Sequence, residues 1–276
     1  MDSPTGSTVS SPTGSTVSSP TGSTVSSTLK HGLSKVPEVT LVFWIIKIFA
    51  TTLGETAGDA VSMSMNLGYL AGTAIFAAVF LLAVFVQIKS TRFHPAVYWA
   101  TIIATTTVGT TMADFADRSL GIGYTGGSSI LFVLLLASLA VWYRTMGSIS
   151  VDTVNNPKAE IFYWVTIMFS QTLGTALGDW TSDSAGLGYA ASAAIFGGLL
   201  AITAALYFST KISRTFLFWA AFILTRPLGA VVGDFLDKPI DHGGLALSRY
   251  TASAALLVFM VACIFIFPNR AAKKAH

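Results

Sequence analysis

The chain has 276 residues, of which 53% are hydrophobic and only 11% are charged. A soluble domain carries about 25% charged residues and needs polar surface to cover its core. This composition therefore excludes secreted, fibrous, disordered and nucleic-acid-binding proteins, and it predicts a protein embedded in the lipid bilayer. The net charge of +3 comes with basic residues concentrated in short loops, where they indicate membrane orientation rather than an anionic partner.

The chain begins with a low-complexity tail, in which SPTGSTVS occurs three times, at 3–10, 11–18 and 19–26. Serine, threonine, glycine and proline offer little to bury, so we expect residues 1–35 to be disordered. A secretory signal would need a basic start and an apolar core. Neither is present, and we expect the first membrane helix to direct insertion.

Eight apolar segments of about 20 residues, the length that crosses a hydrocarbon core, follow the tail. They run approximately over 37–58, 67–88, 95–114, 125–144, 158–178, 187–208, 215–234 and 249–267. Lysine and arginine gather mainly on one side of these segments. By the positive-inside rule both termini are cytoplasmic, and we expect a multi-pass membrane protein.

Internal repetition is the strongest signal in the sequence. A tryptophan stands ten residues before a glycine and fifteen before an aspartate in four places. These residues are Trp44, Gly54 and Asp59; Trp99, Gly109 and Asp114; Trp164, Gly174 and Asp179; and Trp219, Gly229 and Asp234. The intervals between the aspartates are 55, 65 and 55 residues, which indicates two successive duplications.

The repeats predict an all-α, polytopic membrane protein with eight transmembrane helices, arranged as four parallel two-helix repeats in two pseudo-symmetric halves. The expected halves are 36–148 and 158–267, joined by a linker at 149–157 and followed by a cytoplasmic tail at 268–276. Each repeat contains an even number of spans, so all four enter the membrane in the same direction, unlike inverted repeats. The four aspartates therefore share one depth, near the outward ends of their helices, and a pseudo-symmetric bundle would bring them together as a ring.

The repeated carboxylates are the candidate metal ligands. A carboxylate near hydrocarbon costs about 2.5–3.5 kcal/mol on insertion scales, and a bound cation or proton would offset that cost. Hard divalent cations such as manganese, magnesium and calcium prefer oxygen ligands. The candidate ligands are Asp59, Asp114, Asp179 and Asp234, with Glu55 one helical turn deeper than Asp59.

In a simpler interpretation, the acidic residues lie in the outer loops and form ion pairs with their neighbours in sequence. Asp117 adjoins Arg118 and Asp237 adjoins Lys238, and surface pairs of this kind are common and weak.

The four tryptophans lie close to the predicted cytoplasmic boundary, which predicts an interfacial aromatic belt.

A polar belt is expected near mid-span, eight residues before each aspartate. Its members are Thr51, Thr106, Gln171 and Arg226. A mid-span cation needs a carboxylate or a watery cavity, so we expect Arg226, or Lys47 one turn before Thr51, or both, to pair with Glu55 or with a motif aspartate. With Asp183 on the outward side, these residues form the predicted substrate pathway.

The four motif tryptophans resemble those of a family of bacterial membrane proteins defined by a repeat of unknown function, with four tandem copies of two spans each. The resemblance covers residues 37–267 and implies the architecture and a location in the bacterial inner membrane. A looser chemical analogy links Glu55-Thr56-Ala57-Gly58-Asp59 to calcium and manganese cation exchangers, whose repeats carry Glu-x-Gly-Asp.

We therefore expect an ion-coupled transporter of a divalent, manganese-like metal cation. One alternative is a proton-coupled transporter of a small anion or zwitterion that uses Lys47 and Arg226, and another is a membrane scaffold or sensor without transport. No nucleophile arrangement or phosphate loop indicates an enzyme, and no cofactor is expected beyond a bound or transported cation. The expected partners are the lipid bilayer and a small cation or solute, without nucleic acid, and a homodimer remains open.

Overall fold

The computed structural model describes residues 34–272. These residues form eight α-helices, which confirms the all-α prediction: α2 (Leu41–Asp59), α3 (Gly68–Lys89), α4 (Pro95–Asp114), α5 (Tyr124–Met146), α6 (Pro157–Asp179), α7 (Gly188–Ser209), α8 (Arg214–Asp237) and α9 (Arg249–Ile266). The predicted disordered tail lies outside the described residues apart from its last two, Ser34 and Lys35. Both are anchored, since the Ser34 hydroxyl donates to the Val151 carbonyl and the Lys35 amide donates to the Val154 carbonyl.

Within the described part, six helices are long and apolar enough to cross a membrane: α2 with its following turn, α3, α5, α7, α8 and α9. The chain is thus a polytopic membrane protein. The other two, α4 and α6, are 20 and 23 residues long but carry many hydroxyl groups. They can do so because neighbouring helices cover most of their surface.

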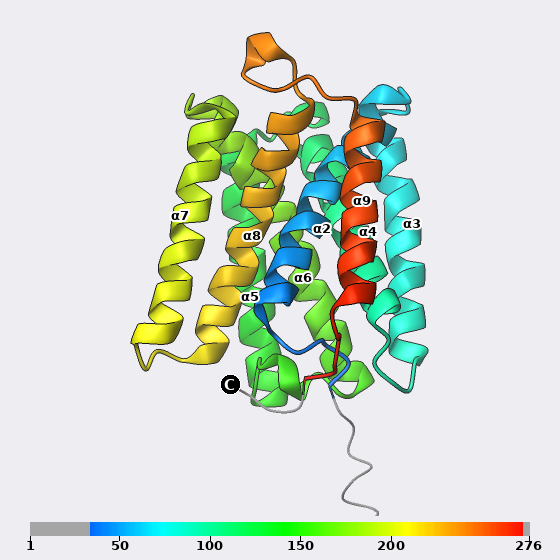
Figure 1. The fold of residues 1–276 in the computed structure, drawn as a ribbon, viewed down its shortest axis with the longest axis vertical. Helices are drawn as coiled ribbons and strands as arrows, with labels where there is room; N and C mark the ends of the chain where they lie inside the picture. The colour runs from blue at the N-terminus through cyan, green and yellow to red at the C-terminus, as the bar shows by residue number, and fades with distance from the viewer. Residues whose placement is uncertain (1–33, 273–276) are drawn as a thin grey trace, which may run out of the picture. The chain divides into compact units, whose positions relative to one another are not determined.

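The helices form an inner ring and an outer layer (Figure 1). The first helix of each repeat belongs to the ring, in which α2 packs against α4, α4 against α6, α6 against α8, and α8 against α2. Each outer helix packs mainly on the inner helix of the next repeat: α3 on α4, α5 on α6, α7 on α8, and α9 on α2. The fourth repeat therefore closes the ring by supplying the outer cover of the first.

The motif glycines allow the inner helices to approach closely. Each glycine faces the belt residue of the next inner helix, and a Cβ atom placed on it would meet that neighbour. The pairs are Gly54 with Thr106, Gly109 with Gln171, Gly174 with Arg226, and Gly229 with Thr51. Small residues at helix interfaces have this role in membrane proteins generally.

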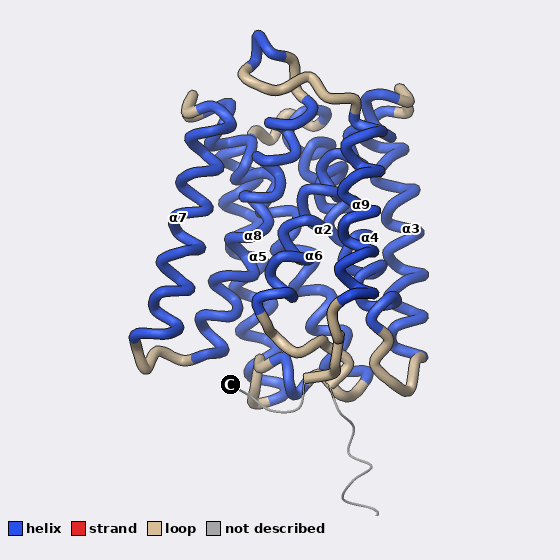
Figure 2. The backbone as a smooth tube through the Cα atoms, viewed as in Figure 1, coloured by secondary structure: helices blue, strands red, loops and turns tan. Residues whose placement is uncertain are grey.

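Three inner helices change their winding directly after the motif aspartate. A single π-helical turn follows α2, α4 and α6, at Ala60–Ser64, Phe115–Ser119 and Trp180–Ser184. Such turns occur frequently at functional sites. The fourth inner helix, α8, stays α-helical to Asp237, and its longer connection to α9 crosses the top of Figure 1. Loops lie only at the two ends of the helices (Figure 2).

An aromatic cluster closes the other end of the ring. In each repeat the residue before the motif tryptophan is aromatic, and it packs on the tryptophan of the next inner helix. The ring-centroid distances are 5.4 Å for Phe43–Trp99, 5.8 Å for Tyr98–Trp164, 6.3 Å for Tyr163–Trp219 and 5.7 Å for Phe218–Trp44. We call these eight residues the aromatic seal.

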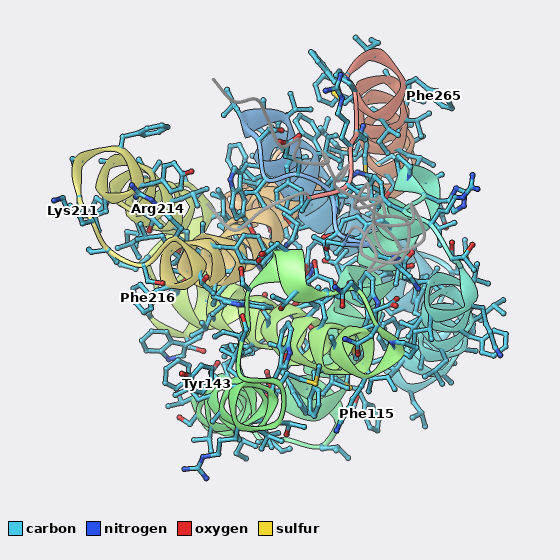
Figure 3. All side chains as sticks on the ribbon, turned by 90° about the horizontal axis from the view of Figure 1, so that it is seen from below. Phe115, Tyr143, Lys211, Arg214, Phe216 and Phe265 are labelled. Atoms are coloured by element: carbon cyan, nitrogen blue, oxygen red, sulfur yellow. The ribbon has the colours of Figure 1, made fainter. Side chains whose placement is uncertain are left out.

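The aromatic seal contradicts the predicted interfacial belt. Trp99, Trp164 and Trp219 are buried and only Trp44 is partly exposed, because this side of each inner helix faces its neighbour in the ring and not the lipid. The surface aromatics come instead from other positions, such as Tyr143, Phe216 and Phe265, which point outward in the end-on view (Figure 3).

The two ends of the described chain meet. The Glu38 amide donates to the Arg270 carbonyl and the Ala272 amide donates to the Val36 carbonyl, at 2.8 and 2.9 Å. The paired segments lie at the lower end of Figure 1, away from the motif aspartates.

Candidate functional site

The four motif aspartates are buried at the upper end of the ring, each at 1–2% exposure. Three of them are the last α-helical residues of α2, α4 and α6, and Asp234 lies one turn before the end of α8. A carboxylate at a helix C-terminus faces the negative end of the helix dipole. The protein must therefore supply positive charge at this place.

Two basic residues bridge the aspartates in pairs. The Arg118 guanidinium lies 3.0 Å from Asp114 and 3.7 Å from Asp179. The Lys238 ammonium lies 2.6 Å from Asp59 and 3.0 Å from Asp234. Arg118 and Lys238 are 120 residues apart, as are the corresponding aspartates, so the two bridges are related by the pseudo-twofold symmetry of the halves.

These bridges replace the local ion pairs of the simpler interpretation, which is wrong for both residue pairs. Asp237 pairs with Arg249 at 3.0 Å instead of Lys238. Asp117 has no ion pair among residues 34–272, because the Arg118 side chain is directed to the carboxylate four residues earlier. The acidic residues are not independent loop residues.

Some of the carboxylates lie close to one another in groups of three, which the pairwise bridges by Arg118 and Lys238 do not require. Glu55, Asp179 and Asp234 each place one oxygen within 4.8 Å of the others, and so do Asp59, Asp234 and Asp237. A hard cation takes oxygen ligands at about 2.3–2.6 Å, so ligand atoms on opposite sides of it stand about 5 Å apart. The first group combines helices α2, α6 and α8 in a spacing that a single ion fits.

The charge in this cluster is unbalanced. Six carboxylates (Glu55, Asp59, Asp114, Asp179, Asp234 and Asp237) face four paired basic side chains (Arg118, Arg226, Lys238 and Arg249). If all are ionised, two negative charges remain. One divalent cation or two protons would neutralise them, and an uncompensated buried charge is costly.

Arg226 is paired as the sequence predicts. Its guanidinium lies 2.8 Å from Glu55, and it also donates to the Thr110 hydroxyl at 2.6 Å, to the Thr175 hydroxyl and to the Thr51 carbonyl. The sequence reasoning did not place Thr110 and Thr175 in the pathway. Both occupy the position of Glu55 in their repeats, and this equivalence was the available signal.

Lys47 is not paired in this way. Its ammonium donates to the Thr225 hydroxyl at 3.3 Å and lies 4.1 Å from the centre of the Phe222 ring, and no carboxylate of residues 34–272 is within ion-pair distance. The expectation of a carboxylate partner is therefore met by Arg226 alone.

The other belt residues lie at helix interfaces. The Thr51 hydroxyl donates to the Ile48 and Thr225 carbonyls. The Thr106 hydroxyl and both ends of the Gln171 amide are buried without a partner among the described residues. None of these three residues belongs to the groups of converging carboxylates.

A cavity of about 640 Å³ opens above the carboxylates. Its lining includes Arg118, Lys238 and Arg249 with the exposed Asp183. The three basic side chains are 13–32% exposed whereas the carboxylates that they pair with are at most 3% exposed, so the basic groups separate the carboxylates from the cavity. Burial would lower the pKa of Lys238, but Asp234 and Asp59 more than offset this and raise its pKa well above the usual value.

A second cavity of about 780 Å³ lies near the other end, against α2, α7 and α8. Its wall is mostly apolar and includes the highly exposed Leu41 and Phe208. It is therefore a groove on the lipid-facing side and has no access to the carboxylates.

Comparison with known proteins supports the repeat architecture. A family described as "Repeat of Unknown Function (DUF347)" matches residues 42–93, 97–148, 162–213 and 217–267. No curated protein and no solved structure matches the chain, so the analogy to cation exchangers receives no support. Each match contains one inner helix, the outer helix that follows it, and one motif tryptophan and aspartate. Since the four matches cover most of the chain, the protein belongs to this family of tandem membrane repeats.

Proposed function

We propose that the protein is a transporter of a divalent metal cation, manganese-like in its preference for oxygen ligands. The convergence of Glu55, Asp179 and Asp234 oxygens within 4.8 Å is the observation that carries the proposal. Asp59 and Asp114 flank this group and are held by Lys238 and Arg118. An entering cation would take over part of the neutralisation that these two residues provide.

The two ends of the ring support transport rather than simple binding. At one end a cavity lies against Arg118, Lys238 and Arg249, which cover the carboxylates, and at the other end the aromatic seal closes the ring. A site that only a few side chains separate from a cavity on one side, with a thicker closure on the other, fits one state of an alternating-access cycle. Opening of the seal would complete the cycle.

We also propose the orientation and location. Lys35 and Arg270 lie at the end that carries the seal, which by the positive-inside rule is the cytoplasmic end. The carboxylates then face outward across the bacterial inner membrane, with both termini in the cytoplasm.

The alternative of an anion or zwitterion transporter is less favoured. Arg226, its main candidate ligand, is fully buried and already bound to a carboxylate, two hydroxyls and a carbonyl. An anion would have to displace Glu55. The scaffold alternative can be distinguished by experiment. It predicts that replacing the carboxylates by uncharged amides affects assembly but not ion flux.

Purified full-length protein in liposomes provides the test. The wild type should move Mn²⁺ down its gradient, and the triple variant Glu55→Gln, Asp179→Asn, Asp234→Asn should lose this flux. Asp241→Asn is the matched control, because Asp241 is 80% exposed in the loop at the same end and makes no contact with the cluster carboxylates. The proposal is wrong if the wild type moves neither Mn²⁺, Ca²⁺ nor Mg²⁺, or if the triple variant transports like the wild type.

A further inference from the structure

Lys47 is a buried basic residue that the proposed transport step leaves unused. Its side chain has no solvent exposure, and among residues 34–272 one of its three possible donors finds an acceptor, the Thr225 hydroxyl. The Phe222 ring face provides weak additional attraction. A charged lysine inside a membrane protein normally pairs with an acid or faces water, so the protonated form of Lys47 is held without a compensating anion.

Among residues 34–272, Lys47 has a basic side chain nearby but no carboxylate within ion-pair distance. On α8 the nearby charged group is Arg226. α8 also carries Arg214 at its start and Asp234 and Asp237 near its end. The titratable groups on the other helices packed against α2 are Tyr98 and Asp114 at the two ends of α4, and Arg249, Tyr250 and Cys263 on α9. None of these makes a hydrogen bond or an ion pair with Lys47 within residues 34–272. Glu55, on the same helix, is held by Arg226.

A short chain of contacts links Lys47 to the candidate cation site. Lys47 donates to Thr225, whose carbonyl accepts the Thr51 hydroxyl, and the Thr51 carbonyl accepts from Arg226 at 3.3 Å. Arg226 then reaches Glu55. Only neutral groups stand between the two basic side chains, so the Glu55 carboxylate is what keeps their repulsion small.

We propose that Lys47 is the proton carrier that couples proton movement to cation transport; this inference rests on the proposed function. When a divalent cation binds Glu55, the Arg226 guanidinium loses its anionic partner. Its repulsion of Lys47 then increases. When opening of the ring admits water to this level, an N–H bond of the ammonium breaks and the proton passes to that water, leaving a neutral amine. When the cation leaves, Glu55 pairs with Arg226 again and Lys47 takes up a proton, so cation and proton bind alternately without sharing a ligand.

The repeats provide the variant that removes this group with the least disturbance. The positions equivalent to Lys47 are Ile102, Ile167 and Phe222, and all three are fully buried. Lys47→Ile therefore places in α2 a residue that two other inner helices carry at the same level. Lys47→Arg is the second variant, because arginine keeps the charge and does not release its proton.

The test measures protons released per Mn²⁺ bound, by calorimetry of the purified full-length protein in buffers of different ionisation enthalpy. Lys47→Ile should release about one proton fewer per ion than the wild type and bind Mn²⁺ about tenfold more tightly, because one nearby positive charge is gone. Lys47→Arg should release one proton fewer as well but bind more weakly. Lys89→Met, at the exposed end of α3, is the control and should match the wild type.

The outcomes separate the two proposals. If the wild type binds no Mn²⁺, both the proposed function and this inference fail. If the wild type binds and the Lys47 variants release as many protons as it does, cation binding stands and the role of Lys47 is overturned. If Lys47→Ile does not fold, Lys47→Arg decides by the same proton count.

Discussion

Replacing Arg226 by methionine should destabilise the fold strongly, because the substitution leaves Glu55 buried without its partner. Methionine retains the apolar stem that packs at Gly174 and removes the guanidinium. The guanidinium has contacts with Glu55, Thr110, Thr175 and Thr51. Its removal therefore isolates the electrostatic effect from most of the packing effect.

The expected magnitude follows from the burial of the pair. Arg226 has no side-chain exposure and Glu55 has 3%, so solvent offers little screening. Breaking a buried pair by removing one partner costs about 3–5 kcal/mol, whereas removing both charges is often close to neutral. Arg226→Met should lower the unfolding free energy by about that amount, and Glu55→Gln added to it should recover most of the loss.

Reversible unfolding in mixed micelles, followed by circular dichroism, provides the assay for both single variants and the double variant. Coupling between contacting residues appears as an interaction energy of about 0.5–3 kcal/mol. A loss of less than about 1 kcal/mol for Arg226→Met would show that the pair is not the main stabilising contact of Glu55. A double variant that loses the sum of the two single effects would show that the two residues are not coupled.

Three further predictions concern the glycine contacts, the bridging lysine and the seal. Gly229→Ala should lower the unfolding free energy by about 1–3 kcal/mol, because the added methyl group overpacks on Thr51. Gly198→Ala is the control: a Cβ there would meet no neighbouring atom within 4 Å, and the substitution should raise the unfolding free energy by about 0.5–1 kcal/mol. Equal effects of the two substitutions would contradict the close helix contact at Gly229. Lys238→Met should tighten Mn²⁺ binding about tenfold, because one positive charge next to the site is removed. Since the pKa of Lys238 is raised, the wild-type side chain loses its charge only as pH rises above about 10.4. Binding titrations at pH 6 and at pH 8 should therefore show the same gain in affinity for the variant over the wild type. Phe218→Ala should open the seal and give an Mn²⁺ leak in liposomes that persists when Glu55 is replaced by glutamine, and an intact barrier in this variant would exclude the seal from gating.

The sequence predicts the repeat architecture well because duplication leaves a signal that no single helix carries. The spacing of Trp44, Asp59 and their equivalents is sufficient to assign the inner helices. Closure of the ring by α9 on α2 could not be predicted, since it depends on contacts between the first and last repeats. The inward position of the tryptophans was missed for the same reason, because hydropathy does not distinguish a lipid-facing residue from one that faces another helix.

The candidate site was predictable in its residues but not in its pairings. Arg118 and Lys238 each follow an aspartate by four residues, a spacing that places both side chains on one face of a helix. That signal was available, whereas adjacency in sequence suggested ion pairs with Asp117 and Asp237. The second contact of each bridge, from Arg118 to Asp179 and from Lys238 to Asp59, crosses between repeats and requires the folded ring.

Three charged departures from fourfold repetition lie at one helix interface. Glu55 stands where the other repeats have threonine or alanine, Arg226 where they have threonine or glutamine, and Lys47 where they have isoleucine or phenylalanine. All three contribute to the interface of α2 and α8, where the first and last repeats meet. The symmetric residues therefore build the ring and its aspartates, and these three residues add the charges that the proposed coupled transport cycle needs at a single place. A ring with four identical interfaces would bind a cation equally at each of them and would have no preferred site at which to exchange it for a proton.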